Sequence, residues 1–279
     1  MNILVTGHKG FIGKNMTKYL KQRHSVVGYE YKKDHFPDLK NIDLVIHLGA
    51  LTSTTNLDIK SIIEQNINFS IKLIEQVIKK KINIQIASSA SVYGNYSDFK
   101  EGSTLKPESP YAVSKFLVEK FFSSLDKKKI SNYVQIFRYF NVYGEYEKKK
   151  KEQASPLTKF VIQAKKKKKI FLFENSKNYL RDFIWVGDLC RIHEFFFRIK
   201  KSGIFNIGTG KSYTFECIAQ IIAKKYNAKI IYIPMPENIK KHYQKYTKAN
   251  LDNLKKYIRI RFKSPKEYLD TLNYMKNTI

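Results

Sequence analysis

The feature that most constrains this chain is a glycine-rich turn near its beginning, GHKGFIG at residues 7–13. An apolar segment at residues 2–5 precedes it, and residues 11–21 have the pattern of a helix. Glycines between a strand and a helix let the backbone approach a pyrophosphate, and the helix N-terminus supplies amide donors and positive potential. We therefore predict a phosphate-binding strand–turn–helix unit. Its ligand-facing residues are predicted to be Gly7, Gly10, Phe11, Ile12 and Gly13.

Strand and helix patterns alternate through the first half of the chain. The further predicted strands are residues 25–29, 44–47, 82–88 and 133–137, and the further helices are residues 59–81 and 111–125. Such alternation indicates an α/β protein with a doubly wound parallel sheet, covered by helices on both faces. The pattern becomes mixed after Gly144. We expect a nucleotide domain at residues 1–144, to which 181–210 return, and a smaller, mainly substrate-binding domain at 145–279.

The connection between the second and third predicted strands is unusually short. The second strand ends at Glu30, and only 13 residues, 31–43, connect it to the strand that begins at residue 44. The helix and strand that usually follow the second strand of such a sheet cannot fit into this length. The sheet is therefore predicted to lack its usual third strand, and the adenine pocket to be built differently or to be more open.

The composition excludes several classes of protein. Two cysteines rule out a disulfide scaffold, and no cysteine or histidine spacing indicates a metal site. No run of 18 apolar residues is present, so we predict no membrane span. The first residues lack the basic region of a signal peptide, and we expect a cytoplasmic protein. The net charge is +28, but 45 of the 52 basic residues are lysines, whereas specific nucleic-acid surfaces use arginine. We therefore expect no specific nucleic-acid partner.

A tyrosine and a lysine four residues apart form the candidate catalytic pair. Tyr111 and Lys115 lie on one face of the predicted helix 111–125. An ammonium group beside a phenol favours the phenolate, so Lys115 is expected to lower the pKa of Tyr111. Ser89 follows the strand at 82–88, where its hydroxyl can face the same substrate alcohol. These residues predict proton transfer to or from an alcohol.

Four motifs, in order, give the chain a family resemblance. They are GHKGFIG at 7–13, ASSASVYG at 87–94, YAVSK at 111–115 and RYFNVYG at 138–144. Together they resemble the extended short-chain dehydrogenases/reductases, within them the nucleotide-sugar epimerases and dehydratases. The family that fits best is ADP-glycero-manno-heptose 6-epimerase. The stretches that favour it are TSTT at 52–55, SDF at 97–99, LFENS at 172–176, YLRDF at 179–183 and YQKYTKANL at 243–251.

The resemblance implies a Rossmann-type fold, a bound NAD or NADP, and inversion at C6 of the sugar by transient oxidation. Two proton-transfer groups are then expected, one for each face of the ketone. Tyr111, assisted by Lys115 and Ser89, matches the first. Counting without a gap from the RYFNVYG motif gives Lys150 as the second, although its three lysine neighbours at 148, 149 and 151 leave the register open.

The resemblance also implies binding positions and partners. Beyond the glycine turn, the cofactor is expected to contact Glu30, Leu48, Gly49, Ala50, Asn66, Tyr111, Lys115 and Val142. A nucleotide-diphosphate sugar is the expected substrate, and the expected assembly is a homo-oligomer. The substrate is expected to contact Thr52, Ser89, Asn141, Phe173, Ser176, Arg181 and Tyr243.

Three alternatives stay open. Glu30 would bind ribose hydroxyls and favours NAD, whereas Lys9, Lys32 and Lys33 could neutralise a 2′-phosphate and favour NADP. The reaction could instead be a 4-epimerisation or a 4-keto reduction; a 4,6-dehydration is disfavoured because Ser91 and Val92 are not acidic. A redox-silent binding module is the non-enzymatic alternative, and the intact set of Ser89, Tyr111 and Lys115 argues against it.

Overall fold

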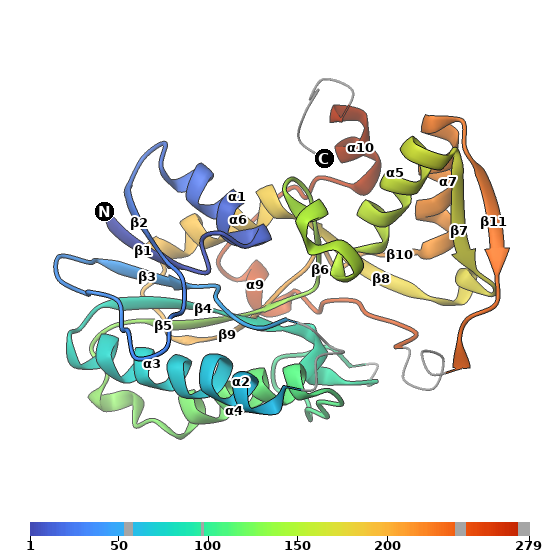
Figure 1. The fold of residues 1–279 in the computed structure, drawn as a ribbon. Helices are drawn as coiled ribbons and strands as arrows, with labels where there is room; N and C mark the ends of the chain where they lie inside the picture. The colour runs from blue at the N-terminus through green and yellow to red at the C-terminus, as the bar shows by residue number, and fades with distance from the viewer. Residues whose placement is uncertain (53–57, 96–97, 238–243, 273–279) are drawn as a thin grey trace.

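The computed structural model describes residues 1–52, 58–95, 98–237 and 244–272. Its larger part is built on a six-stranded parallel sheet with the strand order β2-β1-β3-β4-β5-β9 (Figure 1). The strands are β1 (Asn2–Thr6), β2 (Ser25–Tyr29), β3 (Leu44–His47), β4 (Asn83–Ser89), β5 (Val134–Tyr139) and β9 (Gly203–Ile207). The predicted parallel sheet is confirmed.

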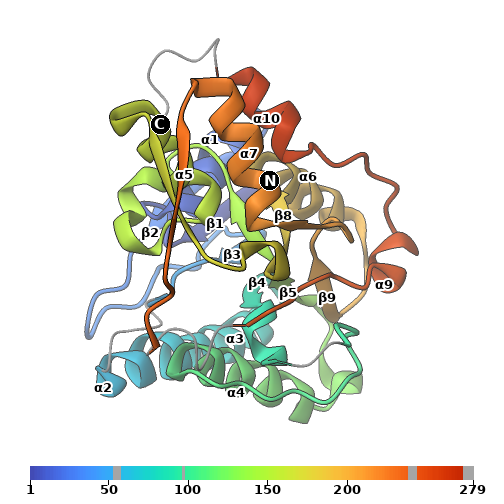
Figure 2. The same ribbon diagram turned by 90° about the vertical axis from the view of Figure 1, so that its right-hand side faces the viewer.

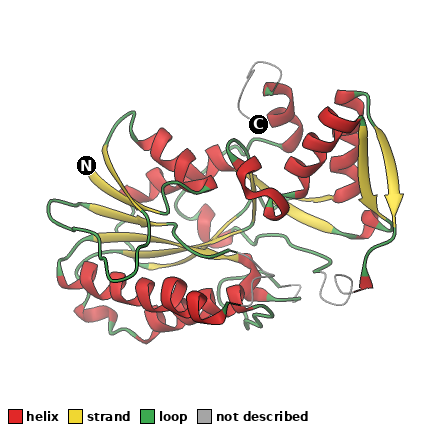
Figure 3. Cartoon of the chain, viewed as in Figure 1, coloured by secondary structure: helices red, strands yellow, loops and turns green. Residues whose placement is uncertain are grey.

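Helices cover both faces of this sheet (Figures 1 and 3). On one face lie α1 (Phe11–Leu20) and α6 (Val186–Phe195). On the other lie α2 (Ile59–Ile62), α3 (Phe69–Lys79) and α4 (Pro110–Ser124). Alternate residues of β1 supply the two cores: Ile3 belongs to the α1 side, and Leu4 packs with the α3 side.

Because of the short connection, the sheet has no strand beyond β2 among the described residues. Residues 31–43 contain neither helix nor strand beyond a bridge between Lys32 and His35, as their length predicted. In the part of the chain that the structure describes, β2 pairs only with β1, and its outer side is an edge of the sheet. Val27 in β2 is 52% exposed as a result. The absent third strand is the principal departure from the usual order of a doubly wound sheet.

The helix predicted for residues 59–81 is not a regular α-helix throughout. Between α2 and α3 the chain forms a π-helical segment, η1 (Ile63–Asn68). The wider turn of this segment rotates the faces of the helix, and Ile63 is 43% exposed. Asn66 points inward instead and is fully buried. The prediction of one regular helix was wrong because periodicity along the sequence carries no sign of this bulge.

The smaller part of the protein lies beside the carboxyl ends of the sheet strands. A three-stranded sheet, ordered β10-β8-β6, and a parallel pair of β11 with β7 form its frame. These strands are β6 (Asn141–Tyr143), β7 (Lys169–Phe173), β8 (Leu180–Trp185), β10 (Ser212–Thr214) and β11 (Lys229–Ile233). The helices here are α5 (Pro156–Lys167), α7 (Phe215–Tyr226) and α10 (Pro265–Thr271), seen from their outer side in Figure 2.

Short helical turns complete the structure. They are η2 (Ala90–Tyr93), η3 (Lys127–Lys129), η4 (Glu147–Gln153), η5 (Ser176–Asn178), η6 (Phe196–Arg198) and α9 (Asp252–Lys255). Within the described ranges, none of the helices has the length and apolar character that crossing a membrane requires.

Candidate functional site

The glycine turn brings the start of α1 against the end of β3. Gly7 has φ +68°, and a Cβ atom on it would lie 2.7 Å from the Cα of Gly49. A Cβ atom on Gly13 would lie 2.0 Å from the carbonyl oxygen of Gly7. Both positions therefore require glycine. Gly10 is the N-cap of α1 and has no side chain with which to cap it, so the amides of the first helical turn face the space beyond.

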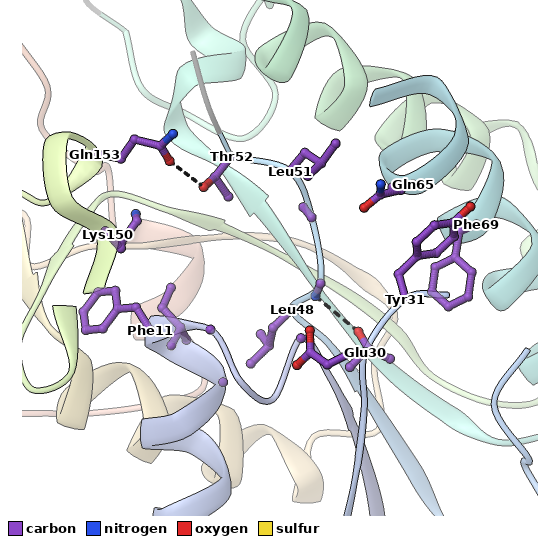
Figure 4. A pocket seen from close by; sticks show the side chains of 17 residues that line it. Phe11, Glu30, Tyr31, Leu48, Leu51, Thr52, Gln65, Phe69, Lys150 and Gln153 are labelled. Atoms are coloured by element: carbon purple, nitrogen blue, oxygen red, sulfur yellow. Dashed lines mark hydrogen bonds between the residues drawn. The ribbon is translucent and has the colours of Figure 1, made fainter. Parts of the chain in front are cut away.

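A cavity of about 370 Å³ opens in front of this turn (Figure 4). It is lined by nine of the predicted cofactor residues, together with Thr52 and Lys150. The nine are Gly7, Gly10, Phe11, Ile12, Gly13, Glu30, Leu48, Gly49 and Ala50. Six further residues line it that the sequence did not single out: Thr6, Tyr31, Leu51, Gln65, Phe69 and Gln153. Of these six, Tyr31 could have been inferred from the sequence, because it directly follows the predicted cofactor residue Glu30.

Glu30 is fixed at the floor of the cavity by the glycine turn itself. Its Oε1 accepts a hydrogen bond of 2.6 Å from the backbone amide of Lys9 and lies 3.1 Å from Nδ1 of His8. The carboxylate is half-buried, with its side chain 35% exposed. Lys9, Lys32 and Lys33 are all exposed, and none of these three is among the residues lining the cavity.

Asn66 connects the cavity wall to the helix that carries the predicted catalytic pair. Its Oδ1 accepts from the Leu51 amide at 2.8 Å, and its Nδ2 donates to the Leu51 carbonyl at 2.9 Å. The same Nδ2 donates to Oγ of Ser114 at 3.1 Å, and that hydroxyl donates to the Tyr111 carbonyl at 2.7 Å. Asn66, predicted to bind the cofactor, does not line the cavity and instead holds its wall.

The predicted catalytic pair lies on the first turns of α4. Ser109 caps this helix by accepting from the Ala112 amide, and Pro110 occupies its first position. Lys115 is 4% exposed. Its Nζ donates to the Ala87 carbonyl at 2.8 Å and lies 5.9 Å from the centroid of the Tyr111 ring. Tyr111 and Lys115 are thus adjacent, although neither they nor Ser89 and Val142 are among the residues lining the cavity.

The electrostatics of this pair differ from the expectation. Burial raises the pKa of Tyr111 to about 12, and a hydrogen bond with the Ser89 side chain acts in the opposite direction. Burial lowers the pKa of Lys115 to about 8, while the charge of Glu119 raises it. The predicted lowering of the Tyr111 pKa is therefore wrong, because burial of the phenol raises the pKa by more than the hydrogen bond with Ser89 lowers it.

Lys150 differs from its three lysine neighbours. It is half-buried and lines the cavity, with its Nζ 5.9 Å from the centroid of the Phe11 ring. Lys148, Lys149 and Lys151 are exposed. Burial lowers the pKa of Lys150, and the charge of Glu147 opposes this. The surrounding turn η4 is anchored by Glu147, which accepts hydrogen bonds from Ser155 and Thr158.

Gln153 closes the same end of the cavity. Its Oε1 accepts a hydrogen bond of 3.3 Å from the Thr52 hydroxyl, which links η4 of the smaller part to the loop after β3 (Figure 4). Nothing in the sequence singled out Gln153, because the contact joins residues 101 positions apart.

The predicted substrate residues of the smaller part lie outside this cavity. Asn141 starts β6, which pairs with β8 so that Asn141 is opposite Phe183, two residues from Arg181. Oδ1 of Asn141 accepts a hydrogen bond of 3.4 Å from the Thr247 hydroxyl. The Arg181 guanidinium lies 5.3 Å from the Phe215 ring centroid and donates to the Leu180 carbonyl.

Of the other predicted substrate residues in the smaller part, Phe173 and Ser176 lie next to each other. Phe173 ends β7, and its carbonyl accepts a hydrogen bond from the buried hydroxyl of Ser176 at the start of η5. Tyr243 lies outside the described residues. Asn141 and Arg181 lie on the neighbouring strands β6 and β8, close to each other in register. None of the four described substrate residues on β6, β7, η5 and β8 lines the cavity in front of the glycine turn.

A buried ion pair joins α4, the helix that carries the predicted catalytic pair, to the parallel sheet. Arg138 at the end of β5 and Glu119 on α4 are each 2% exposed, and Nη2 lies 2.6 Å from Oε2. Ser88 donates to the same carboxylate at 2.5 Å, and the guanidinium donates to the Tyr93 hydroxyl at 2.9 Å. Together with Ser88, the pair links α4, β4 and β5, and Glu119 lies one helical turn after Lys115.

Removing the charge of Glu119 should destabilise the protein strongly. Glu119→Gln leaves the buried Arg138 cation without its counterion, so we expect the free energy of unfolding to fall by about 3 kcal/mol. Urea denaturation followed by circular dichroism measures this. Glu75→Gln, on the exposed side of α3, is the matched control and should change it by less than about 0.5 kcal/mol. Equal stability of the two variants would contradict the role of the pair.

The parallel sheet, the glycine turn and the cavity define a nucleotide-binding protein of the Rossmann type. The model of the NAD dependent epimerase/dehydratase family matches residues 3–208. The chain belongs to this family.

Solved structures of nucleotide-sugar enzymes share the fold over the whole chain. ADP-L-glycero-D-manno-heptose-6-epimerase from Helicobacter pylori is 25% identical, with a TM-score of 0.84 over 99% of this chain and 96% of that one. UDP-N-acetylglucosamine 4-epimerase from Methanobrevibacter ruminantium, in complex with UDP-N-acetylmuramic acid, is 22% identical, with a TM-score of 0.86 over 98% of each chain. UDP-glucose 4-epimerase from Thermotoga maritima, with UDP-glucose, is 20% identical, with a TM-score of 0.81 over 98% of this chain and 99% of that one.

Proposed function

We propose that this protein is a nucleotide-sugar epimerase that inverts C6 of an ADP-heptose by transient oxidation. The observation that carries the proposal is the position of Lys150, which alone among residues 148–151 lines the cavity in front of the glycine turn. A second proton-transfer group is what separates inversion from a one-face reduction. The 25% identity to the Helicobacter pylori heptose epimerase over 99% of the chain supports the choice of sugar.

The residues of the cavity fit a nicotinamide dinucleotide. Gly7, Gly10 and Gly13 leave the backbone open to a pyrophosphate, and the N-terminus of α1 supplies amide donors. The Glu30 carboxylate stands where ribose hydroxyls can donate to it. NAD or NADP bound there would accept a hydride from the sugar carbon and return it. Glu30 supports NAD, and the exposed Lys9, Lys32 and Lys33 are the residues near the turn that could accommodate NADP.

Tyr111 and Lys150 would handle protons on opposite faces of the sugar. Tyr111 is protonated at neutral pH because burial raises its pKa to about 12, and the Ser89 side chain is hydrogen bonded to it. Lys115 supports it with a positive charge 5.9 Å from the ring centroid. Burial lowers the pKa of Lys150, which makes its proton easier to release than that of an exposed lysine.

The remaining predicted contacts are part of the same proposal. Thr52, Ser89, Asn141 and Arg181 would hold the nucleotide-diphosphate sugar. Phe173 and Ser176 would contact its nucleotide end, and Tyr243 would lie near its phosphates. The pairing of β6 with β8 supports the joint use of Asn141 and Arg181. An arginine suits a diphosphate because its guanidinium can donate two parallel hydrogen bonds.

The proposal extends to the organisation of the chain. Residues 1–144 would bind the cofactor and residues 145–279 mainly the substrate, with 181–210 returning to the first domain through β9, which pairs with β5. A cytoplasmic homo-oligomer is the proposed assembly. An exposed apolar strip on neighbouring helices supports the oligomer. Light scattering would measure its molar mass in solution. The strip consists of Ile59, Ile63, Val113 and Leu117.

A substrate panel, run with identification of the cofactor, tests the function. Mass spectrometry of the nucleotide released from purified protein should detect NAD or NADP. ADP-heptose, UDP-glucose and UDP-N-acetylglucosamine are then incubated separately, and chromatography follows the epimers. We expect interconversion of the two C6 epimers of ADP-heptose. Conversion of a UDP-sugar alone would identify a 4-epimerase. A keto product formed together with an equal amount of reduced cofactor would identify a keto reductase running in reverse, and bound cofactor with no turnover a redox-silent binding module.

A further inference from the structure

The absent third strand leaves the far end of the cavity with an unusual wall. In a doubly wound sheet the adenosine half of a dinucleotide lies beyond the glycine turn, at the end of the second strand. Here the chain leaves β2 at Glu30 and Tyr31 and forms no strand before β3 begins at Leu44. Figure 4 shows Tyr31 and Phe69 side by side at this end, with Gln65 next to them and Lys150 at the opposite end. The replacement wall is therefore aromatic.

Phe69 is the centre of this wall. Its ring is stacked on Tyr29 at 5.7 Å with an interplanar angle of 8°, and meets Tyr31 edge to face at 5.4 Å. Phe36 and His47 contact it from two other directions, both at 5.8 Å. Phe69 is only 8% exposed, so it is held in place and offers the cavity little more than an edge. Its function in the wall is to brace Tyr31.

Tyr31 has ring surface available to a ligand. It is half-buried and lines both the main cavity and a second one of about 530 Å³ on the outer side of the wall. The connection that carries it is anchored, because the Tyr29 hydroxyl donates to the His35 carbonyl at 2.6 Å. An anchored aromatic ring beside a phosphate-binding turn is suited to pack against a planar base.

The π-helical segment supplies a polar group at the same place. In η1 the side chain of Asn66 is fully buried, whereas the neighbouring Gln65 lines the cavity. An amide carries both a donor and an acceptor, which matches the hydrogen-bonding edge of adenine. The lysines of this region, Lys32, Lys33 and Lys72, line only the second cavity. At the end opposite Lys150, the main cavity thus combines the aromatic ring of Tyr31 with the neutral amide of Gln65.

We propose that Tyr31, braced by Phe69, forms the adenine-binding wall of the cofactor site and that Gln65 contacts the edge of the base. The assignment rests on the proposed function only for the presence of a nicotinamide dinucleotide. It replaces the contacts that the absent strand would have provided, with residues drawn from the connection after β2 and from the π-helical segment.

The test compares NAD with its nicotinamide half. Calorimetric titration of the full-length protein gives the affinity for NAD, and ligand-observed NMR gives that for nicotinamide mononucleotide, which lacks the adenosine half. Tyr31→Ala should weaken NAD binding by roughly 5- to 150-fold, the range for loss of one aromatic–base stack. It should leave the mononucleotide affinity unchanged. Tyr31→Phe keeps the ring and should bind NAD within about twofold of wild type.

Tyr232→Ala is the matched control, because this exposed tyrosine lies on β11 in the smaller part of the protein. It should leave both affinities unchanged. NAD affinity in Tyr31→Ala equal to that of wild type would overturn the adenine wall, as would equal loss of NAD and mononucleotide binding. Wild-type protein that binds NAD normally but converts no sugar nucleotide would overturn the proposed function alone. Wild-type protein that binds neither NAD nor NADP would overturn both.

Discussion

Tyr111→Phe should lower turnover by at least about a hundredfold while leaving cofactor affinity unchanged, as expected for the loss of a positioned acid–base group. The substitution removes one hydroxyl and keeps the ring that packs beside Lys115. It also removes the hydrogen bond with the Ser89 side chain. Steady-state turnover of ADP-heptose and calorimetric titration of NAD measure the two quantities.

Tyr232→Phe provides the control for this substitution. Tyr232 is exposed on β11 and its hydroxyl donates to Glu216, so the loss of that hydroxyl should leave turnover within about twofold of wild type. If Tyr111→Phe retained wild-type turnover, the proton transfer assigned to Tyr111 would be wrong. If it lost cofactor affinity as strongly as turnover, Tyr111 would be a binding residue instead.

Lys150→Met should nearly abolish inversion and leave chemistry on the Tyr111 face largely intact. Methionine keeps the length of the apolar stem beside Phe11 and removes the ammonium group. Inversion needs a proton-transfer group on each face of the ketone, whereas dismutation of a 6-aldehyde analogue needs only one. We therefore expect C6 epimerisation to fall by at least about a hundredfold. Dismutation of the analogue should change by less than about threefold, an order-of-magnitude limit for a group outside that step.

The neighbouring lysines are matched controls from the same turn. Lys148→Met, Lys149→Met and Lys151→Met each remove one positive charge from an exposed position. Their effects on inversion should be small, because exposed charges interact weakly with the site through water. Equal and mild effects of all four substitutions would mean that the turn only attracts anions. The protein would then be a one-face reductase, and the epimerase proposal would fail.

The parallel sheet and the glycine turn followed from local pattern. Alternating strands and helices have few compatible arrangements, and the glycines at positions 7 and 13 leave room that no other residue leaves. The 13-residue connection likewise predicted the absent strand, because chain length alone limits what can form there. Position along the chain was also enough to bring Tyr111 beside Lys115, since four residues make one turn of a helix.

Other features depend on contacts between distant residues. The π-helical segment forms where Asn66 reaches both Leu51 and Ser114, neither of them close in sequence. The pKa of Tyr111 was predicted with the wrong sign, because burial of a phenol depends on what surrounds it and not on its nearest charged neighbour. The Thr52–Gln153 hydrogen bond joins the two parts of the protein across 101 positions.

By itself, the sequence determined the α/β class, the glycine turn between β1 and α1 and the helix that carries Tyr111 and Lys115. These are properties of short segments, in which steric and periodic rules act within a few residues. Only the tertiary structure decided which of four consecutive lysines enters the cavity, which side chain braces Tyr31 and which carboxylate neutralises Arg138. Each of these depends on burial, and burial exists only once segments far apart in the chain have packed together.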